Sequence, residues 1–282
     1  MKPVVLSLGA GVQSSTILLL SCHGLLPKID LAIFADTGWE RLSTYQHLNW
    51  LETEANKYGI PIVRVSMGGD IRDGVVVQKG NNAGLCSSLM PFHGIYHDRP
   101  IMMKRQCTHR YKIQPIRKKI RELFDITSPS LSIGVDLWLG ISTDERQRIT
   151  GYYGAKYAMP HFPLIDIKPM SRNDCLNWLA VNYPEHIPTK SSCIGCPFHD
   201  NSEWRLVYDT PEEWKQAVDF DNYIRSKGFV NIKATIFLHK DKKPLEEIDM
   251  RTELEKGQLI LPEFEKLWGR QNDFITLGAS CE

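Results

Sequence analysis

The sequence lacks long apolar runs, repeats and a charge bias. No stretch approaches the ~20 apolar residues of a membrane-spanning helix, so we expect no membrane segment. After Lys2 the first apolar run is soon interrupted by polar and glycine residues, which predicts no signal peptide. Lys and Arg total 34 against 33 Asp and Glu, so net charge indicates no class of partner.

Cysteine is present but scattered. Seven cysteines, an odd number without framework-like spacing or an export signal, predict reduced thiols in a cytoplasmic protein. Hydrophobic residues at 42% and charged residues at 24% are typical of a globular protein. The thiols should therefore serve packing, metal binding or catalysis.

Strand-like apolar runs alternate with helical segments in the first half of the chain. We expect strands over residues 3–8, 30–35, 61–65 and 137–141, and helices over 14–24, 44–58 and 109–124. This alternation predicts an α/β fold, a Rossmann-like parallel sheet with flanking helices. Residues 67–103 are glycine-rich and are expected to form a long irregular connection.

Beyond about Pro163 the sequence predicts mostly helices instead of alternating strands and helices. Residues 171–181 indicate a capped helix. Thr210-Pro211-Glu212-Glu213 predicts a capping box with proline at the first helical position, opening a helix to about Arg225. We therefore expect an α/β domain over residues 1–165 and a smaller, mostly helical, cysteine-bearing part over 166–282.

Residues 7–15 (SLGAGVQSS) join the first strand to its helix. Gly9 and Gly11 allow close backbone approach, the helix N-terminus offers free N–H groups, and Ser14 and Ser15 add hydroxyls, which together suit a phosphate or sulfate. The alternative is a plain tight turn. The loop is neither a Walker loop nor a GxGxxG fingerprint, since Ser14 stands at the third glycine position.

The second strand ends in Asp36-Thr37-Gly38-Trp39-Glu40. Ligands of open parallel sheets bind outside the carboxyl ends of strands, so this polar segment is a candidate binding element. An N-capping loop is the alternative interpretation.

SLGAGVQSS followed by FADTGWE resembles the PP-loop ATP-pyrophosphatase (adenine nucleotide alpha hydrolase) superfamily, in its phosphoadenosine phosphosulfate (PAPS) reductase-like branch. The segment GISTDERQR, residues 140–148, is similar to a later motif of that family. The resemblance covers most of residues 3–200. It implies that residues 1–165 bind an adenine nucleotide, ATP or adenylyl sulfate, through Ser7, Gly9, Gly11, Gln13, Ser14, Ser15, Asp36, Thr37, Gly38 and Gly140.

Gln13 departs from the pattern of ATP-cleaving members, which carry an aspartate there. A neutral amide binds Mg²⁺ less well than a carboxylate does. The loop in this respect resembles that of the sulfonucleotide reductases, whose substrate lacks a pyrophosphate. If Mg²⁺ is used, Asp36 or Glu40 is a candidate ligand.

Cys193 and Cys196 form a Cys-x-x-Cys pair in KSSCIGCPF. Such a pair can be a redox dithiol, half of a zinc site or part of an iron–sulfur site. The segment around Cys107 resembles the first cluster motif of the family's adenylyl-sulfate reductases, with Gln106 replacing one of two adjacent cysteines. The resemblance implies a [4Fe-4S] cluster on Cys107, Cys193 and Cys196.

The fourth ligand of such a cluster is left open, and Cys86 is a candidate. Zinc would instead take His109 or His199 as a further ligand. Cys281, near the C-terminus, has the placement of the family's catalytic tail cysteine but lacks the surrounding Glu-Cys-Gly motif. A terminal thiol without a role is the alternative.

Residues 99–121 contain nine Lys and Arg and no acid. A solvated helix face is the ordinary interpretation of such a run, but its overlap with Cys107 favours anion binding. By resemblance, Lys112, Arg148 and Arg172 are candidate anion ligands. The anion would be the nucleotide itself or the backbone of tRNA or DNA.

Two chemistries compete for this fold, with a non-catalytic nucleotide-binding module as a third hypothesis. The main expectation is reduction of a sulfonucleotide, with Cys281 as nucleophile and a thiol carrier as electron donor. The alternative is ATP-dependent adenylation of tRNA or DNA followed by sulfur transfer.

Overall fold

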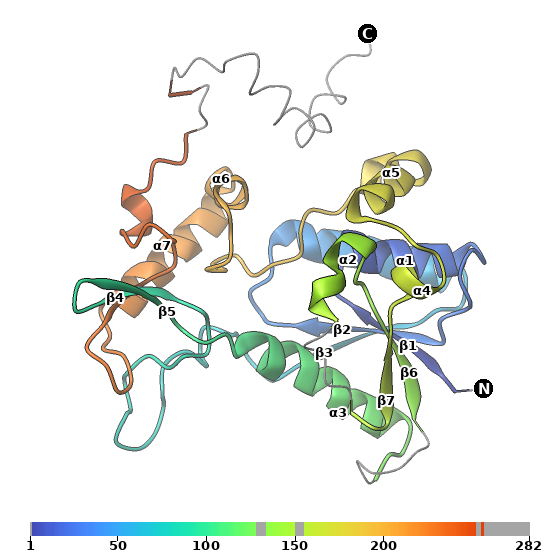
Figure 1. Ribbon diagram of the computed structural model, residues 1–282, viewed down its shortest axis with the longest axis horizontal. Coiled ribbons are helices and arrows are strands. Elements are labelled where there is room, and N and C mark those ends of the chain that lie inside the picture. Colours follow the sequence, from blue (N-terminus) through green and yellow to red (C-terminus); the bar gives the residue numbers. More distant parts are fainter. Residues whose placement is uncertain (1, 128–133, 150–154, 252–254, 257–282) are drawn as a thin grey trace.

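The computed structural model describes residues 2–127, 134–149, 155–251 and 255–256. Its centre is a five-stranded parallel sheet in the order β3-β2-β1-β6-β7 (Figure 1). The strands are β1 (Val4–Leu8), β2 (Leu31–Asp36), β3 (Ile62–Ser66), β6 (Val135–Leu139) and β7 (Ala158–His161). Neighbouring strands pair in parallel throughout. The predicted α/β fold is therefore confirmed.

Helices cover both faces of this sheet (Figure 1). Alternate residues of β1 point to opposite faces, as the two-residue period of a strand requires. Leu6 and Leu8 join a core with α1 (Val12–Cys22), α2 (Leu42–Asn56) and α5 (Arg172–Asn182). Val5 joins a second core on the other face, with α3 (Gln114–Leu123).

A second sheet, antiparallel, lies beside the first (Figure 1). It has the order β5-β4-β8 and consists of β4 (His93–Tyr96), β5 (Arg99–Met102) and β8 (Thr235–Phe237). Helices α6 (Asn201–Tyr208) and α7 (Pro211–Arg225) complete its core, which takes residues from both halves of the chain. The other helical segments of the described residues are short: a π-helix (Thr108–Ile113), α4 (Pro163–Asp166) and 3₁₀ turns at Thr143–Arg148, Pro184–His186 and Leu245–Glu247.

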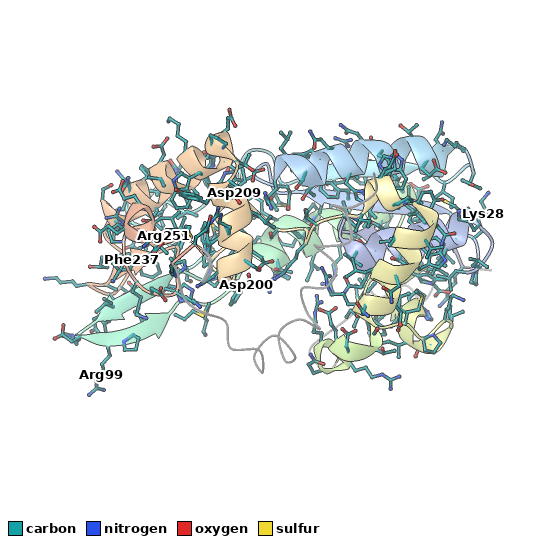
Figure 2. All side chains as sticks on the ribbon, turned by 90° about the horizontal axis from the view of Figure 1, so that it is seen from above. Lys28, Arg99, Asp200, Asp209, Phe237 and Arg251 are labelled. Atoms are coloured by element: carbon teal, nitrogen blue, oxygen red, sulfur yellow. The ribbon has the colours of Figure 1, made fainter. Side chains whose placement is uncertain are left out.

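The expectation of an irregular connection over residues 67–103 is wrong at its end, where β4 and β5 form a hairpin. Its two turn residues, His97 and Asp98, have φ of 46° and 56°. Both central residues of a type I′ turn need positive φ, a role that Asn-Gly usually fills. Sequence reasoning missed this turn because His-Asp is not a usual pair for it. Arg99 follows it, and its side chain points outward from the hairpin (Figure 2).

The helix predicted over residues 109–124 is two elements. A π-helix, Thr108–Ile113, runs directly into α3. Pro115 stands in the first turn of α3. Because proline lacks an N–H, it cannot donate a regular backbone bond to the preceding turn, and the chain adopts a wider turn before it.

The predicted division at residue 165 stays a prediction. Residues after it contribute to the first core, because Met170, Cys175 and Leu179 pack with α1. Ser171 caps α5 in a full capping box with Asp174. No helix in the described part of the chain is long and apolar enough to cross a membrane.

The predicted capping box of α7 is wrong, although the helix has the predicted bounds. Thr210 makes no side-chain cap, and its hydroxyl donates to Leu206 O instead. Glu213 accepts from Arg41 Nε at 2.8 Å and from the Leu42 backbone N–H at 2.8 Å. Both charged side chains are nearly buried. Glu213 therefore ties α7 to the start of α2, a tertiary role that outweighs local capping.

We expect Glu213→Ala to lower the free energy of unfolding by about 3–5 kcal/mol, because it leaves the Arg41 guanidinium buried and unpaired. Thr210→Ala should cost well under the ~1 kcal/mol of a lost capping side chain. Urea unfolding followed by circular dichroism measures both changes. Equal effects of the two substitutions would contradict this assignment of Glu213.

Candidate functional site

The loop of residues 7–15 lies where the order of the parallel sheet reverses. β1 is flanked by β2 on one side and β6 on the other, and such a switch point is where open α/β sheets bind ligands. Gly140, just after β6, abuts the loop so closely that a Cβ there would lie 2.9 Å from Ser14 N. The structure thus brings the predicted glycine and the loop together.

Hydrogen bonds within the loop fix its conformation. Gly9 N–H donates to Ser14 Oγ at 3.1 Å, and Ser14 Oγ donates to Gly11 O at 3.3 Å. No side chain caps α1 after Gly11. The first N–H groups of α1 therefore face the site without a side-chain acceptor, as an anion-binding helix N-terminus requires.

Gln13 forms the centre of a polar network at the loop. Its amide donates to Ser142 Oγ at 3.3 Å and to Glu145 Oε2 at 3.2 Å. Its carbonyl oxygen accepts from Arg172 Nη1 at 3.0 Å. Arg148 Nη1 donates to both oxygens of Glu145 at 2.7 Å. Two of the three predicted anion ligands, Arg148 and Arg172, thus lie at the loop.

Ser142 and Glu145 were not among the predicted site residues. They lie in the GISTDERQR motif, from which sequence reasoning selected only Gly140 and Arg148. Asp144, in the same segment, accepts from the Arg172 backbone N–H at 3.0 Å. Although burial opposes it, hydrogen bonds from Ser142 and Arg172 lower the pKa of Asp144. The network therefore keeps this carboxylate charged beside the loop.

The Cys-x-x-Cys segment pairs directly with the end of β2. Ile194 N–H donates to Trp39 O at 2.9 Å. Thr37 Oγ1 donates to Glu40 Oε1 at 3.0 Å and lies 3.3 Å from Cys193 Sγ. A Cβ on Gly195 would lie 2.2 Å from the Trp39 indole, so only glycine permits this packing. Cys193 thereby lies beside Thr37, a residue of the predicted nucleotide site.

Asp36 and Gly38 shape the adjoining turn. Asp36 Oδ1 accepts from Gly38 N–H at 2.8 Å and from the Tyr45 hydroxyl at 2.7 Å. Burial, and then this bond to Asp36, raise the pKa of Tyr45. Gly38 has φ of 75° and leaves no room for a Cβ beside Asp70. Asp36 therefore holds the turn in place.

Lys112, the third predicted anion ligand, lies at the thiols instead of at the loop. Its Nζ is 2.9 Å from Glu40 Oε1. Although burial opposes it, the charges of Glu40 and Cys193 raise the pKa of Lys112 above its usual value. Glu40 is fully buried, and its Oε2 has no hydrogen-bond partner among the described residues. Glu40 thus places the ammonium group beside the thiols.

The three predicted cluster cysteines share one neighbourhood. Burial raises the pKa of Cys196, the charge of Cys107 adds to this, and Arg105 and Lys112 oppose it. Burial and then Glu40 raise the pKa of Cys193 well above its usual range. Cys107 itself stands at the start of the π-helix.

Three soft thiols beside cationic side chains fit an iron–sulfur cluster in donor chemistry. No three His, Cys, Asp or Glu side chains in the described ranges are close enough together to hold a metal ion as they stand. The cluster therefore remains a prediction for this chain.

The other candidate ligands are placed as follows. His199 is buried, its Nε2 lies 2.9 Å from Ser192 Oγ, and burial lowers its pKa to about 3. His109 is exposed. Cys86 is fully buried in the second core, with its Sγ 3.9 Å from Ile224 O. Cys281 lies outside the described residues.

Comparison with protein-family models and with curated proteins finds no match. Among solved structures, the chain is similar to the U34-tRNA thiolase NcsA from Methanococcus maripaludis with its [4Fe-4S] cluster. The sequence identity is 16%, the TM-score is 0.41, and the match covers 88% of this chain and 74% of that chain.

Acid should destabilise the site through His47, whose Nε2 lies 2.9 Å from Ser15 Oγ. Burial, with a contribution from His186, lowers the pKa of His47 to about 4. Unfolded histidine has a pKa of about 6.5. Between these values the unfolded chain binds the extra proton, so the free energy of unfolding falls as pH decreases, by ~1.4 kcal/mol per unit.

We expect His47→Gln to remove about that slope between pH 6 and pH 4.5 in urea unfolding. The exposed His97 provides the matched control, because His97→Gln should leave the slope intact. A slope unchanged in His47→Gln would show that the acid sensitivity lies elsewhere.

We expect anaerobically purified protein to contain about four irons and four sulfides per chain. Cys107→Ala, Cys193→Ala and Cys196→Ala should each lose most of both. Cys22→Ala, which removes a buried thiol at the end of α1, should keep them. Iron and acid-labile sulfide assays measure the result; zinc without sulfide would refute the cluster.

Proposed function

We propose that the protein uses ATP to adenylate an exocyclic oxygen of a nucleic-acid base, and that sulfur held at the three cysteines then displaces AMP. The pairing of the thiol segment with the nucleotide site carries this proposal. Thr37 Oγ1 lies 3.3 Å from Cys193 Sγ, and the space beside Gly11 is filled by Ser191. A nucleotide on the loop would therefore lie next to the thiols.

The charges at the loop favour a triphosphate with its metal. Arg148 and Arg172 attract phosphate, while Asp144 and Glu145 would repel a bare anion. Carboxylates are the ligands that Mg²⁺ prefers, and Mg²⁺ accompanies ATP in phosphate transfer. Glu145 contacts Gln13 directly, so a carboxylate is present beside the loop although residue 13 is an amide.

Atoms and electrons balance in both steps, and neither step requires an electron donor. The base oxygen attacks the α-phosphorus; a bond to that oxygen forms, and the bond to the β-phosphate breaks to release pyrophosphate. Sulfur at the sulfide level then attacks the base carbon, and AMP leaves with the oxygen and the bonding electrons. When bound, an iron–sulfur cluster with an iron free of protein thiolates supplies a place to hold that sulfur.

Charged side chains of this protein stabilise the negative charge that develops on the leaving groups in these steps. Arg148 and Arg172 stabilise the negative charge that develops on the departing pyrophosphate. Lys112, fixed by Glu40, places a positive charge between the thiols and the end of β2, where AMP would leave. The basic segment of residues 99–121 supports a nucleic acid as the acceptor.

Reduction of a sulfonucleotide is the second candidate, and the neutral Gln13 supports it. A sulfonucleotide carries a phosphate–sulfate anhydride and no pyrophosphate whose charge a metal must neutralise, so an amide suffices in the loop. This chemistry requires a nucleophilic thiol, predicted to be Cys281, and an external thiol carrier.

We expect pyrophosphate release from ATP that depends on added tRNA or single-stranded DNA. Arg172→Ala should lower it by about tenfold or more, because a charge-assisted hydrogen bond at the phosphates is lost. Arg64→Ala is the control, since Arg64 pairs with Glu52 and donates to Asn49, both on α2. A coupled pyrophosphate assay under anaerobic conditions measures both.

The same preparations distinguish the alternatives. Sulfite release from adenylyl sulfate or PAPS, without pyrophosphate release from ATP, would establish the reductase instead. Nucleotide binding with neither product would leave a non-catalytic module.

A further inference from the structure

Phe198, two residues after Cys196, holds an aromatic ring in solvent. Its exposed fraction is 45%. The backbone on both sides is fixed: Pro197 O lies 2.9 Å from His93 Nε2, and the N–H of the buried His199 donates to Cys196 O at 3.0 Å. The exposure of this ring is thus a property of an anchored loop.

Arg105 covers part of the same ring. Its guanidinium lies 5.3 Å from the Phe198 ring centroid, a cation–π contact. Arg105 precedes Cys107 by two residues, and Phe198 follows Cys196 by two. The ring and the guanidinium therefore come from the two segments that carry the thiols.

The chain segment that contains Arg105 is positively charged. Lys104, Arg105 and Arg110 are exposed, and none of them forms an ion pair with a carboxylate in the described part of the chain. Free cationic side chains attract a phosphate backbone. An aromatic ring and a planar guanidinium offer flat faces on which a base can stack.

We propose that Phe198 and Arg105 form a stacking platform for an unpaired nucleobase, with Lys104 and Arg110 contacting the flanking phosphates. The inference rests on the proposed function, for which the platform would hold the acceptor nucleic acid beside the thiols. The base must be unpaired, because stacking in a duplex covers the faces that the platform needs.

The test is fluorescence anisotropy of the full-length protein with a labelled single-stranded RNA, a DNA of the same sequence and the matching duplex. We expect Phe198→Ala to weaken binding of a single strand about tenfold, the size of one lost base stack. Phe198→Trp should restore it, and Arg105→Ala should weaken it and reduce its salt dependence. The RNA and DNA arms identify the source of the base.

Tyr223 provides the matched control. It is 44% exposed and lies under a cation, Lys227 Nζ at 4.9 Å, but it belongs to α7. Tyr223→Ala should leave binding unchanged. Undetectable binding by the wild type, equal binding of Phe198→Ala and wild type, or preference for the duplex would overturn the proposal.

Two further readouts separate the inference from the proposed function. Loss of ATP affinity in Phe198→Ala, with oligonucleotide affinity intact, would assign the ring to the nucleotide's adenine and overturn the platform. If Phe198→Ala loses oligonucleotide binding but the wild type never releases pyrophosphate, the platform stands and the proposed function fails. If nucleic-acid-dependent pyrophosphate release and oligonucleotide binding both survive Phe198→Ala, the proposed function stands and the platform fails.

Discussion

The packing of Gly195 on the indole of Trp39 is the contact on which the site depends. Trp39 is almost fully buried, its ring meets Phe220 at 4.9 Å between centroids, and its Nε1 donates to Gln216 at 3.1 Å. One side chain at the end of β2 thus joins the parallel sheet, the thiol segment and α7. Because the fit to glycine leaves no space for a Cβ, the position of the thiol segment against Trp39 is set by close packing.

The charged side chains of the site lie in two separate groups. At the loop, Gln13 joins Arg172 and Glu145, so side chains of both charges lie there. At the thiols, the buried Glu40 pairs with Lys112. A buried carboxylate is costly unless it is paired and hydrogen-bonded, and this pairing fixes where the ammonium group lies. For this reason the predicted anion ligands lie in two places: Arg148 and Arg172 lie at the loop, and Lys112 lies at the thiols.

Sequence reasoning predicted the elements whose signals are local. The strand ending in Asp36 and the loop carrying Gln13 follow from apolar runs and glycine positions, and the structure has both. It missed the β4–β5 hairpin, because His97 and Asp98 adopt positive φ without glycine or asparagine. It also assigned Glu213 to a cap, where an ion pair with a distant segment prevails. The identities of the cluster and nucleotide ligands stay predictions.

The sequence by itself determined the strands and helices of the α/β domain and the glycine-rich turn after the first strand, since these depend on residues close together in the chain. The tertiary structure placed that turn at the switch point of the sheet, because β1 pairs with the distant β6. Only the tertiary structure decided which distant side chains meet. Arg105 lies over the ring of Phe198, and Arg172 donates a hydrogen bond to Gln13, although each pair is far apart in the chain. Such contacts depend on packing between segments, and no local pattern encodes them.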